Sequence, residues 1–395
     1  MFGLSHLGYT CPVGRTSKNL VADLPRHVPT VRILGTHGVP ANYGGFETAA
    51  ENVALYLVKH GWRVVVYCQT DHTGPTHEDM WNGVERVNIS VPNLGWLGTA
   101  KFDLLSILHA VKHRDTCLTF GYNTGILNIL QRLYRVPNVI NMDGIEWSRK
   151  RWGIFRQTIL YVNERFAALF GNELIADHPE LNTYLQTRAP ARKITTITYG
   201  AHRVANASIE PISALNLRPR EYLTLIARPL PENSILELVE GFSARPRGVD
   251  LVVLGKYDGT TDAYHAAVMN AASDEVRFLG AIYDPSTVQA LRHHSLGYLH
   301  GHTVGGTNPS LVEALAAGNP VIAHDNKYNT WVADNAGLYF KTVEDVDIKI
   351  GELLADPNLA EKLSQNAVAR YNTEFTWEHV AGQYETLLRK SQQSR

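Results

Sequence analysis

Apolar and polar positions alternate in a regular order from about residue 31 onward. Val31–Leu34 and Val64–Cys68 are short, almost unbroken apolar runs, which is typical of strands buried on both faces of a parallel sheet. Between them, apolar residues recur at helical spacing until Gly61, which predicts a helix over about 46–60. The residues of its apolar face are Phe46, Ala50, Val53, Leu57 and Val58.

The same alternation of strand and helix continues through two long segments. In the first segment we predict strands near 84–91, 117–120, 136–141, 173–176 and 193–198, with helices near 100–112, 126–134 and 154–170. In the second we predict strands near 222–227, 251–254, 276–279, 295–299 and 321–323. Residues 200–219 contain prolines and small polar groups that break the rhythm, so we place a linker there. The fold class is therefore α/β, with two Rossmann-like domains facing each other across a cleft.

These patterns divide the chain into parts. Residues 1–30 are predicted to be an N-terminal extension without an assigned function, residues 31–200 the N-terminal domain and residues 201–375 the C-terminal domain. A last helix within 376–395 has an apolar face made of Trp377, Val380, Tyr384 and Leu387–Leu388. We expect this face to pack back across the linker as a C-terminal crossover helix.

Composition excludes several classes of protein. A length of 395 residues favours two domains, and a net charge of -1 argues against a general nucleic-acid binder. Cys11, Cys68 and Cys117 are widely spaced and form no C-x-x-C motif, so we predict neither a disulfide framework nor a zinc site. No apolar run approaches the length of a membrane span. A cytoplasmic location fits these features.

A glycine loop followed by a short helix, residues 305–318, is the most informative stretch. Asn308 is suited to cap a helix, Pro309 to begin it and Gly318 to end it, which predicts a helix over about 309–317. The unpaired N–H groups of its first turn, with the positive end of the helix dipole, would bind a diphosphate. Glu313 would then accept hydrogen bonds from ribose hydroxyls. The alternative is an ordinary capped helix with Glu313 in solvent.

A second glycine loop, residues 35–47, follows the first predicted strand. Glycines at this place let the backbone approach a ligand closely. The loop does not read G-x-G-x-x-G, and the second strand ends in Gln69 instead of the acidic residue that binds the ribose of NAD. An NAD-dependent dehydrogenase is therefore disfavoured.

Charged and aromatic side chains follow other predicted strands. Arg228 comes after the first strand of the second domain, where a guanidinium can bind two diphosphate oxygens, unless it is a surface arginine. Asp143, Glu146 and Trp147 follow a buried strand and offer acceptors and a flat ring for a sugar, although Asp143 is also suited to cap a turn. His178, beside Asp177, faces either the cleft or a turn.

Residues 147–156 interleave arginine and lysine with tryptophan and phenylalanine. This pattern favours contact with an anionic membrane surface, or else it is a solvated helix start. Asp345-Val346-Asp347 resembles a metal–diphosphate motif, but it lies in a predicted acidic helix, and the seventeen histidines lack metal-ligand spacing. We therefore predict no metal.

Three motifs together resemble one enzyme family. They are G-T-H-G-V-P-A-N-Y-G-G-F-E-T at 35–48, N-M-D-G-I-E-W at 141–147 and G-G-T-N-P-S-L-V-E-A-L at 305–315. With the two domains and the final helix, they resemble the GT-B glycosyltransferases of retaining family four. More narrowly, they resemble a bacterial subgroup that includes rhamnosyltransferases of surface polysaccharide assembly. The resemblance covers about residues 31–390.

The resemblance implies a set of site residues. Asp143, Arg228 and Glu313 would serve catalysis. The donor would be bound through Gly44, Gly45, Arg228, Lys256, Tyr283, Thr307, Asn308 and Glu313, and the acceptor through Glu47, Glu146, Trp147 and His178. Two positions depart from the family: Gly305 stands where a glutamate is usual, and Asn233 where a lysine is common. Lys256 is the candidate replacement cation.

The implied activity is transfer of a hexosyl unit, with retention, from a nucleotide-diphosphate sugar to a lipid-linked saccharide or other saccharide acceptor. The leading donor is dTDP-rhamnose, and the reaction would need no metal or other cofactor. The enzyme would work in the cytoplasm or at the inner face of the membrane, and nucleic acid would not be a partner. Two alternatives stay open: a nucleotide-sugar epimerase or hydrolase of the same shape, and a non-catalytic nucleotide-sugar-binding protein.

Overall fold

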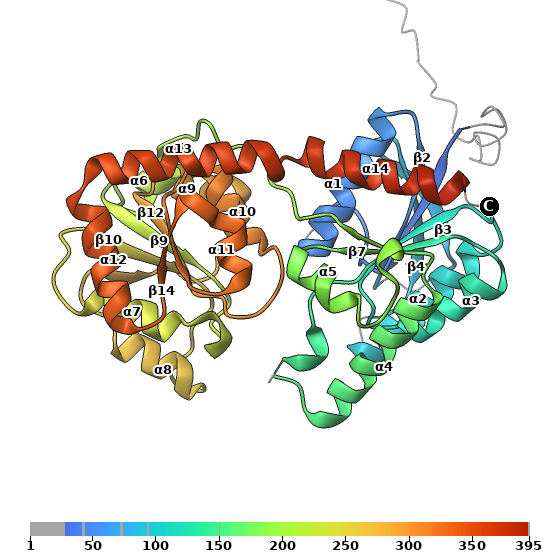
Figure 1. Cartoon of the computed structure of the whole chain (residues 1–395), viewed down its shortest axis with the longest axis horizontal. Coiled ribbons are helices and arrows are strands. Elements are labelled where there is room, and N and C mark those ends of the chain that lie inside the picture. The colour runs from blue at the N-terminus through green and yellow to red at the C-terminus, as the bar shows by residue number, and fades with distance from the viewer. Residues whose placement is uncertain (1–27, 42–43, 72–73, 93–94, 150, 394–395) are drawn as a thin grey trace, which may run out of the picture.

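The structure is a computed structural model that describes residues 28–41, 44–71, 74–92, 95–149 and 151–393. The predicted extension, with Cys11, lies almost wholly outside the described residues. Asn42 and Tyr43 of the glycine loop 35–47 and Lys150 also lie outside them. Two sheets, each flanked by helices, stand side by side (Figure 1). The α/β architecture of two Rossmann-like domains is therefore confirmed.

The N-terminal sheet has the strand order β3-β4-β2-β1-β5-β6-β7-β8. Its strands are β1 Thr30–Leu34, β2 Arg63–Thr70, β3 His77–Trp81, β4 Val84–Ser90, β5 Thr116–Phe120, β6 Asn138–Asn141, β7 Glu173–Ala176 and β8 Ile194–Thr196. All neighbours are parallel except β3, which pairs antiparallel with β4 at the edge and was not predicted. Its polar, largely exposed sequence carries no apolar run. The helices are α1 Gly45–Lys59, α2 Trp96–Ala110, α3 Asn128–Leu133, α4 Ile154–Phe170 and α5 Pro179–Leu185.

The C-terminal sheet has the order β11-β10-β9-β12-β13-β14, and every pair is parallel. Its strands are β9 Tyr222–Ile226, β10 Asp250–Leu254, β11 Val276–Phe278, β12 Gly297–His300, β13 Val321–His324 and β14 Gly337–Phe340. The helices are α6 Glu210–Ala214, α7 Ile235–Ser243, α8 Ala263–Asn270, α9 Pro285–His293, α10 Pro309–Ala316, α11 Lys327–Ala333, α12 Val343–Ala355 and α13 Pro357–Glu374. The short helix α6 lies in the segment predicted to be a linker.

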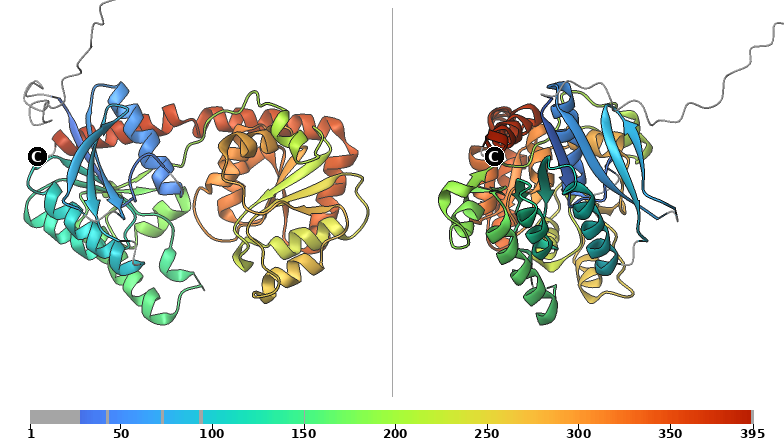
Figure 2. Two further views of the ribbon diagram at one scale, coloured as in Figure 1. Left: turned by 180° about the vertical axis from the view of Figure 1, so that it is seen from behind. Right: turned by 90° about the vertical axis from the view of Figure 1, so that its right-hand side faces the viewer.

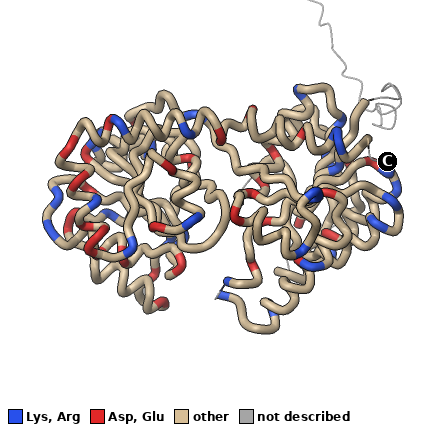
Figure 3. Tube along the Cα trace, viewed as in Figure 1, with Lys and Arg blue, Asp and Glu red and all other residues tan. Residues whose placement is uncertain are grey.

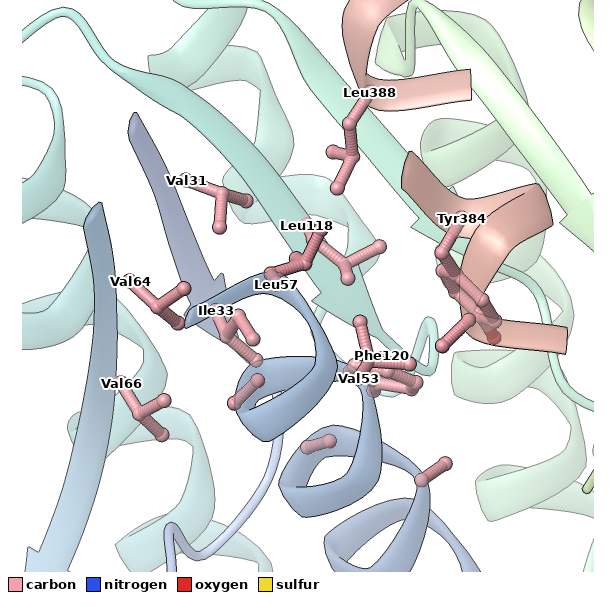
Figure 4. Close-up of a cluster of buried hydrophobic side chains, with 14 of the residues drawn as sticks. Val31, Ile33, Val53, Leu57, Val64, Val66, Leu118, Phe120, Tyr384 and Leu388 are labelled. Atoms are coloured by element: carbon pink, nitrogen blue, oxygen red, sulfur yellow. The ribbon is translucent and has the colours of Figure 1, made fainter. Parts of the chain in front are cut away.

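Buried apolar side chains explain why the strands and helices of the N-terminal domain associate. Val31 and Ile33 on β1 and Val64 and Val66 on β2 point toward Leu57 of α1, and all of them are buried (Figure 4). Helices cover both faces of a parallel sheet, so the alternate strand residues that point to one face pack against the helix on that face. This core fixes the sheet whose strand ends carry the candidate site residues.

The last helix, α14 Trp377–Gln393, returns to the N-terminal domain. Helices α13 and α14 run along one side of both domains in Figures 1 and 2, and α14 packs beside α1. Tyr384 and Leu388 of α14 enter the N-terminal core, and Asn141 Nδ2 donates a hydrogen bond of 2.7 Å to the Tyr384 hydroxyl. The predicted packing of this helix is confirmed.

Charges of both signs are spread over the two domains (Figure 3). The carboxyl ends of the parallel strands in both sheets lead into loops that line the cleft between the domains. In sheets of this kind the carboxyl edge is the usual ligand site, so a ligand is expected in the cleft.

Candidate active site

A cavity of about 450 Å³ lies between the two domains. Loops from both halves of the chain line it. The lining includes Gly45, Asn123, Asp143, Glu146, Arg149, Arg151, Trp152, Arg156, Asp177, Arg228, Asn233, His302, Gly305, Gly306, Thr307 and Asn308. The three motifs that are far apart in the sequence therefore meet at one cavity.

The loop 305–308 enters helix α10 as the sequence predicted. Asn308 caps the helix through its side-chain oxygen, which accepts a hydrogen bond of 3.0 Å from the backbone N–H of Ser310, and Pro309 is the first helical residue. Gly305 has a φ of 125°, a conformation that suits glycine. The buried Thr307 hydroxyl donates to the backbone carbonyl of Asp177 in the opposite domain. The helix N-terminus thus borders the cavity and favours an anion there.

Arg228 follows strand β9 and lines the cavity on the same side as α10. It is exposed, and within the described part of the chain no carboxylate pairs with its guanidinium. Asn233, which stands where the family commonly has lysine, donates from Nδ2 to the Arg228 carbonyl over 2.7 Å. Asn233 therefore fixes the backbone that carries Arg228.

Glu313 does not line the cavity directly. Its carboxylate accepts from Arg292 Nη2 over 2.6 Å; the side chain of Arg292 is 7% exposed and that of Glu313 is 37% exposed. Arg292 lies at the end of α9, and its role was not predicted because nothing near it in the sequence marks it. The ion pair holds Glu313 on α10, one turn beyond the loop.

Two aspartates from neighbouring strands of the N-terminal sheet face the cavity. Asp143 follows β6 and has a φ of 54°, which is uncommon for a residue other than glycine. Burial raises its pKa, and the nearby Glu146 carboxylate adds to this shift. Burial, together with the charge of Asp143, raises the pKa of Asp177 to about 7. Oδ1 of Asp177 is buried and accepts no hydrogen bond from the residues the structure describes.

An ionic cluster crosses the cleft near these aspartates. Glu146 pairs with Arg149 over 2.6 Å and with Arg151. Arg149 Nη1 also pairs with Glu232 of the C-terminal domain over 2.8 Å. Glu146 therefore lines the cavity, as expected, but its carboxylate is shared between two arginines. Arg149 joins the two domains.

Several predicted residues lie outside the cavity lining. Trp147 donates from Nε1 to the buried Glu164 and to Tyr184, and Glu47 accepts from the N–H of His37 over 3.2 Å.

Lys256 and Tyr283, predicted to bind the donor, are exposed on the C-terminal domain and do not line the cavity. Gly44 precedes α1, whereas its neighbour Gly45 lines the cavity. The binding roles of these residues stay predictions.

His178 takes the second of its two predicted positions, at a turn instead of facing the cleft. It is fully buried where the domains meet, with Nδ1 accepting from Glu180 N and Nε2 within 3.3 Å of the Tyr328 carbonyl. Burial lowers its pKa to about 4. The side chain caps α5 and packs against Tyr328 and Trp331, so it is the neighbouring Asp177 that reaches the cavity.

His302 also lines the cavity and was not predicted. Burial, with the charges of Arg228 and Arg149, lowers its pKa to about 3, so the imidazole is neutral at physiological pH. It follows β12 as Arg228 follows β9, the next strand in the sheet. The rule that strand ends carry site residues would have indicated it.

The D-x-D motif has structural partners. Asp345 forms a capping box with Thr342 at the start of α12, and Asp347 pairs with Arg247 over 2.7 Å. Among the described residues, histidine, cysteine and carboxylate side chains form no cluster of three that would hold a metal ion.

Family models match both halves of the chain. Residues 28–202 match a domain of unknown function, DUF1972, and residues 235–386 match a family described as glycosyl transferase-like. The protein is a glycosyltransferase. No curated protein matches its sequence.

Solved structures show the same two-domain architecture. Sucrose-phosphate synthase from Thermosynechococcus elongatus is similar with a TM-score of 0.76 at 18% identity, over 93% of this chain and 100% of that one. Anabaena HepE in complex with UDP and glucose has a TM-score of 0.71 at 17% identity, over 92% and 100%. WaaG, a glycosyltransferase involved in lipopolysaccharide biosynthesis, has a TM-score of 0.68 at 14% identity, over 91% and 99%. The glycosyltransferase therefore has the GT-B fold.

Proposed function

We propose that this glycosyltransferase moves a hexosyl unit from a nucleoside diphosphate sugar to a saccharide acceptor, with retention of configuration. The observation that carries the proposal is the placement of Arg228 and the N-terminus of α10 on the same side of the interdomain cavity. A guanidinium without a carboxylate partner and a helix N-terminus are both suited to a diphosphate. The complex of Anabaena HepE with UDP and glucose supports this type of donor by analogy.

The proposed reaction breaks the bond between the anomeric carbon and the departing diphosphate oxygen. The acceptor hydroxyl oxygen attacks the anomeric carbon from the same face, and its proton passes to the departing diphosphate oxygen. Arg228 and the N–H groups at the start of α10 stabilise the negative charge that develops on the diphosphate. Asp143 faces the developing positive charge of the sugar ring or orients the acceptor. In this mechanism the enzyme supplies no nucleophile and needs no metal.

The donor contacts are assigned to the C-terminal side of the cavity. Thr307 and Asn308 would contact the diphosphate or the sugar, and Glu313, held by Arg292, would accept from the ribose. Gly45 would approach the diphosphate from the opposite domain. These roles follow the resemblance of the glycine-rich motifs to retaining family four.

The finer identity of the substrates is also part of the proposal. The motifs favour a rhamnosyl unit from dTDP-rhamnose and a lipid-linked saccharide acceptor in surface polysaccharide synthesis. Ile154 and Phe155, which are exposed beside Arg151 and Arg156, would touch the inner face of the membrane. Within the described residues, no helix is long and apolar enough to cross a membrane. Membrane contact would therefore be made at the surface.

A thermal-shift panel with UDP, dTDP, GDP and ADP tests the donor site. A ligand at a hundredfold excess over its Kd adds about 2.7 kcal/mol to the free energy of unfolding. We expect dTDP to stabilise the protein most, both with and without added magnesium. Stabilisation by another nucleoside diphosphate would replace dTDP as the nucleotide of the donor. If none of them stabilises the protein, the proposal is contradicted.

Product analysis separates transfer from the other two activities. A transferase releases nucleoside diphosphate faster when an acceptor is present and forms a glycoside with the anomeric configuration of the donor. A hydrolase or an epimerase would consume dTDP-rhamnose at the same rate without an acceptor. A non-catalytic binding protein would be stabilised by dTDP but would never release it from the donor.

A further inference from the structure

A second cavity, of about 690 Å³, opens in the N-terminal domain next to the cleft. Helices α2 and α4 and the segment after β5 form its walls, and most of the side chains are apolar. They include Trp96, Leu104, Ile126, Leu127, Phe155 and Ile159. Phe155 is 78% exposed and Ile126 is 47% exposed, which is unusual for large apolar side chains in one groove. We call this cavity the apolar groove.

The apolar groove adjoins the interdomain cavity. Asn123, Arg156 and Leu160 line both of them, and we call the place where these three side chains lie the junction. Helix α4 begins at Ile154, and its first turns carry both Phe155 in the groove and Arg156 at the junction. A polar cavity between the domains and an apolar groove outside the cleft therefore lie next to each other.

The charges along this site are arranged for an anion at the junction. Among the described residues that line the apolar groove, the charged ones are Lys101 and Arg156, and both are cationic. The Arg156 guanidinium lies 3.6 Å above the ring of Trp152, and Trp152 donates from Nε1 to Glu146 over 2.9 Å.

Arg156 differs in one respect from its neighbours at the cleft. Arg149 and Arg151 are neutralised by Glu146 and Glu232, whereas no carboxylate of the described residues pairs with Arg156. A cation held by an aromatic ring and free of a counter-ion is suited to bind a phosphate.

We propose that the apolar groove binds the hydrocarbon chain of a phosphate-linked acceptor lipid, with the lipid phosphate at Arg156 and the saccharide end in the interdomain cavity. The order of the three parts along the site is apolar groove, cationic junction and polar cavity. An amphiphile made of a hydrocarbon chain, a phosphate and a saccharide has the same order. The inference rests on the proposed function for the identity of the saccharide end.

A protein partner fits these observations less well than a lipid does. A helix docked on the groove would not explain why the groove adjoins the interdomain cavity or why the cation at the junction has no carboxylate partner. A hydrocarbon chain explains both, because its covalent phosphate must leave the groove at the point where the two cavities meet. The groove thereby also sets which face of the enzyme approaches the membrane.

Binding of a series of alkyl phosphates tests the groove directly. Inorganic phosphate and butyl, octyl and dodecyl phosphate are titrated by calorimetry below the concentrations at which they form micelles. We expect the affinity to rise about fourfold for each methylene that enters the groove, and to level off when the groove is full. Ile126→Ser with Phe155→Ser, both at exposed positions, should flatten this dependence on chain length.

Matched variants on the same domain separate the groove from general surface hydrophobicity. Leu169→Ser removes an apolar side chain that is 66% exposed on α4 but lies outside the groove, and it should leave the chain-length dependence unchanged. Arg156→Gln should lower the affinity of the protein for dodecyl phosphate to its affinity for dodecanol, because the contribution of the phosphate is lost. Arg165→Gln, an exposed arginine further along α4, should not. An equal loss with Leu169→Ser or Arg165→Gln would overturn the proposal.

Two further outcomes are decisive. If the groove variants weaken binding to anionic phospholipid vesicles but not to monomeric alkyl phosphates, the groove only touches a membrane surface and the proposal fails. Nucleotide binding is measured in parallel on the same variants. Retained dTDP stabilisation with no alkyl phosphate binding would reject the lipid groove alone, whereas alkyl phosphate binding without nucleotide binding would reject the proposed transferase function and leave the groove standing.

Discussion

The carboxylate of Asp177 lies against the Cα atom of Gly306, so that a β-carbon at position 306 would stand 2.0 Å from Asp177 Oδ1 and 2.8 Å from Oδ2. Asp177 belongs to the N-terminal domain and Gly306 to the loop before α10. The absence of a side chain at position 306 is therefore what lets this carboxylate reach the donor side of the cavity.

Gly306→Ala should displace Asp177 or the loop 305–308. Because misplacement by about 1 Å can cost on the order of a hundredfold in rate, we expect a loss of turnover of that order, measured as release of nucleoside diphosphate. Gly153→Ala is the matched control, since nothing lies within 4 Å of its added β-carbon. The clash in Gly306→Ala should also lower the melting temperature. In the double variant Gly306→Ala with Asp177→Ala the clash disappears, so the melting temperature should recover. A melting temperature no higher than that of Gly306→Ala would contradict the clash.

Asp177→Asn should change how stability depends on pH. The pKa of Asp177 is raised to about 7 in the folded protein, above the ordinary value of about 3.9 for an unfolded chain. Between these values the unfolded chain releases the proton and the folded one keeps it, so the wild-type carboxyl lowers stability as pH rises from about 4 to 7. The variant lacks this loss, and its melting temperature relative to wild type should increase over that range.

A carboxyl with the opposite shift is the control for this pH profile. Side-chain and backbone hydrogen bonds lower the pKa of Asp284, which caps α9, to about 2. Its stabilisation is present above about pH 4 and is lost as pH falls toward 2. Asp284→Ala should therefore be destabilised most above pH 4. A constant difference between Asp177→Asn and wild type from pH 4 to 8 would contradict the raised pKa of Asp177.

Arg228→Ala should lower kcat by on the order of a hundredfold, the scale seen when one donor to a developing negative charge is removed. The physical reason is that the departing diphosphate would keep only the N–H groups of α10. The measurement is the steady-state rate of nucleoside diphosphate release at saturating donor. Arg218→Ala, a largely exposed arginine in the 200–219 segment, should have wild-type activity. A kcat of Arg228→Ala within a few-fold of wild type would remove Arg228 from the mechanism.

Glu232→Gln should loosen the contact between the domains. It removes the 2.8 Å ion pair to Arg149, which would keep only its pair with Glu146, a carboxylate that Arg151 shares. Partly exposed ion pairs contribute about 1 kcal/mol or less, so the free energy of unfolding should change little. The radius of gyration from X-ray scattering should nevertheless increase in the absence of ligand. Asp325→Asn breaks the 3.0 Å pair with Lys341 inside one domain and should not increase it. Equal radii for wild type and Glu232→Gln would show that this pair does not hold the two domains together.

Tyr384→Phe should weaken both the crossover helix and the site. Asn141 donates to the Tyr384 hydroxyl over 2.7 Å and accepts from the backbone N–H of Asp143 over 3.1 Å, so α14 supports the position of Asp143. Leaving the buried Asn141 amide without its acceptor should cost about 1–3 kcal/mol in the free energy of unfolding. Denaturant unfolding measures this, with the exposed Tyr134→Phe as control. A loss no larger than that of Tyr134→Phe would show that the hydrogen bond is not needed.

The sequence predicted most elements because helix and strand periodicity is a local property. Helix α4 was predicted near 154–170 and begins and ends at those residues, and the capped helix α10 follows its predicted start signals. The edge strand β3 was missed because its residues are polar, and the four-residue edge strand β14 was missed because it is too short to show a periodic pattern. Arg228, Asp143 and the loop 305–308 could be placed at the cleft because strand order puts the carboxyl ends of parallel strands at one edge.

Local patterns along the chain are thus enough to predict the class of fold, the helix that offers an anion site and the strand ends that carry the charged residues. Which of these residues meet depends on the tertiary structure. Arg149 pairs with Glu232, which lies 83 positions away, and Asn141 with Tyr384, which lies 243 positions away. Glu313 pairs with Arg292 on another helix. Such pairings depend on how two domains close and on which side chains burial leaves near each other, and no local periodicity encodes that distance. For the same reason, the sequence left open whether His178 faces the cleft or a turn, and packing between the domains buries it and leaves Asp177 facing the cavity.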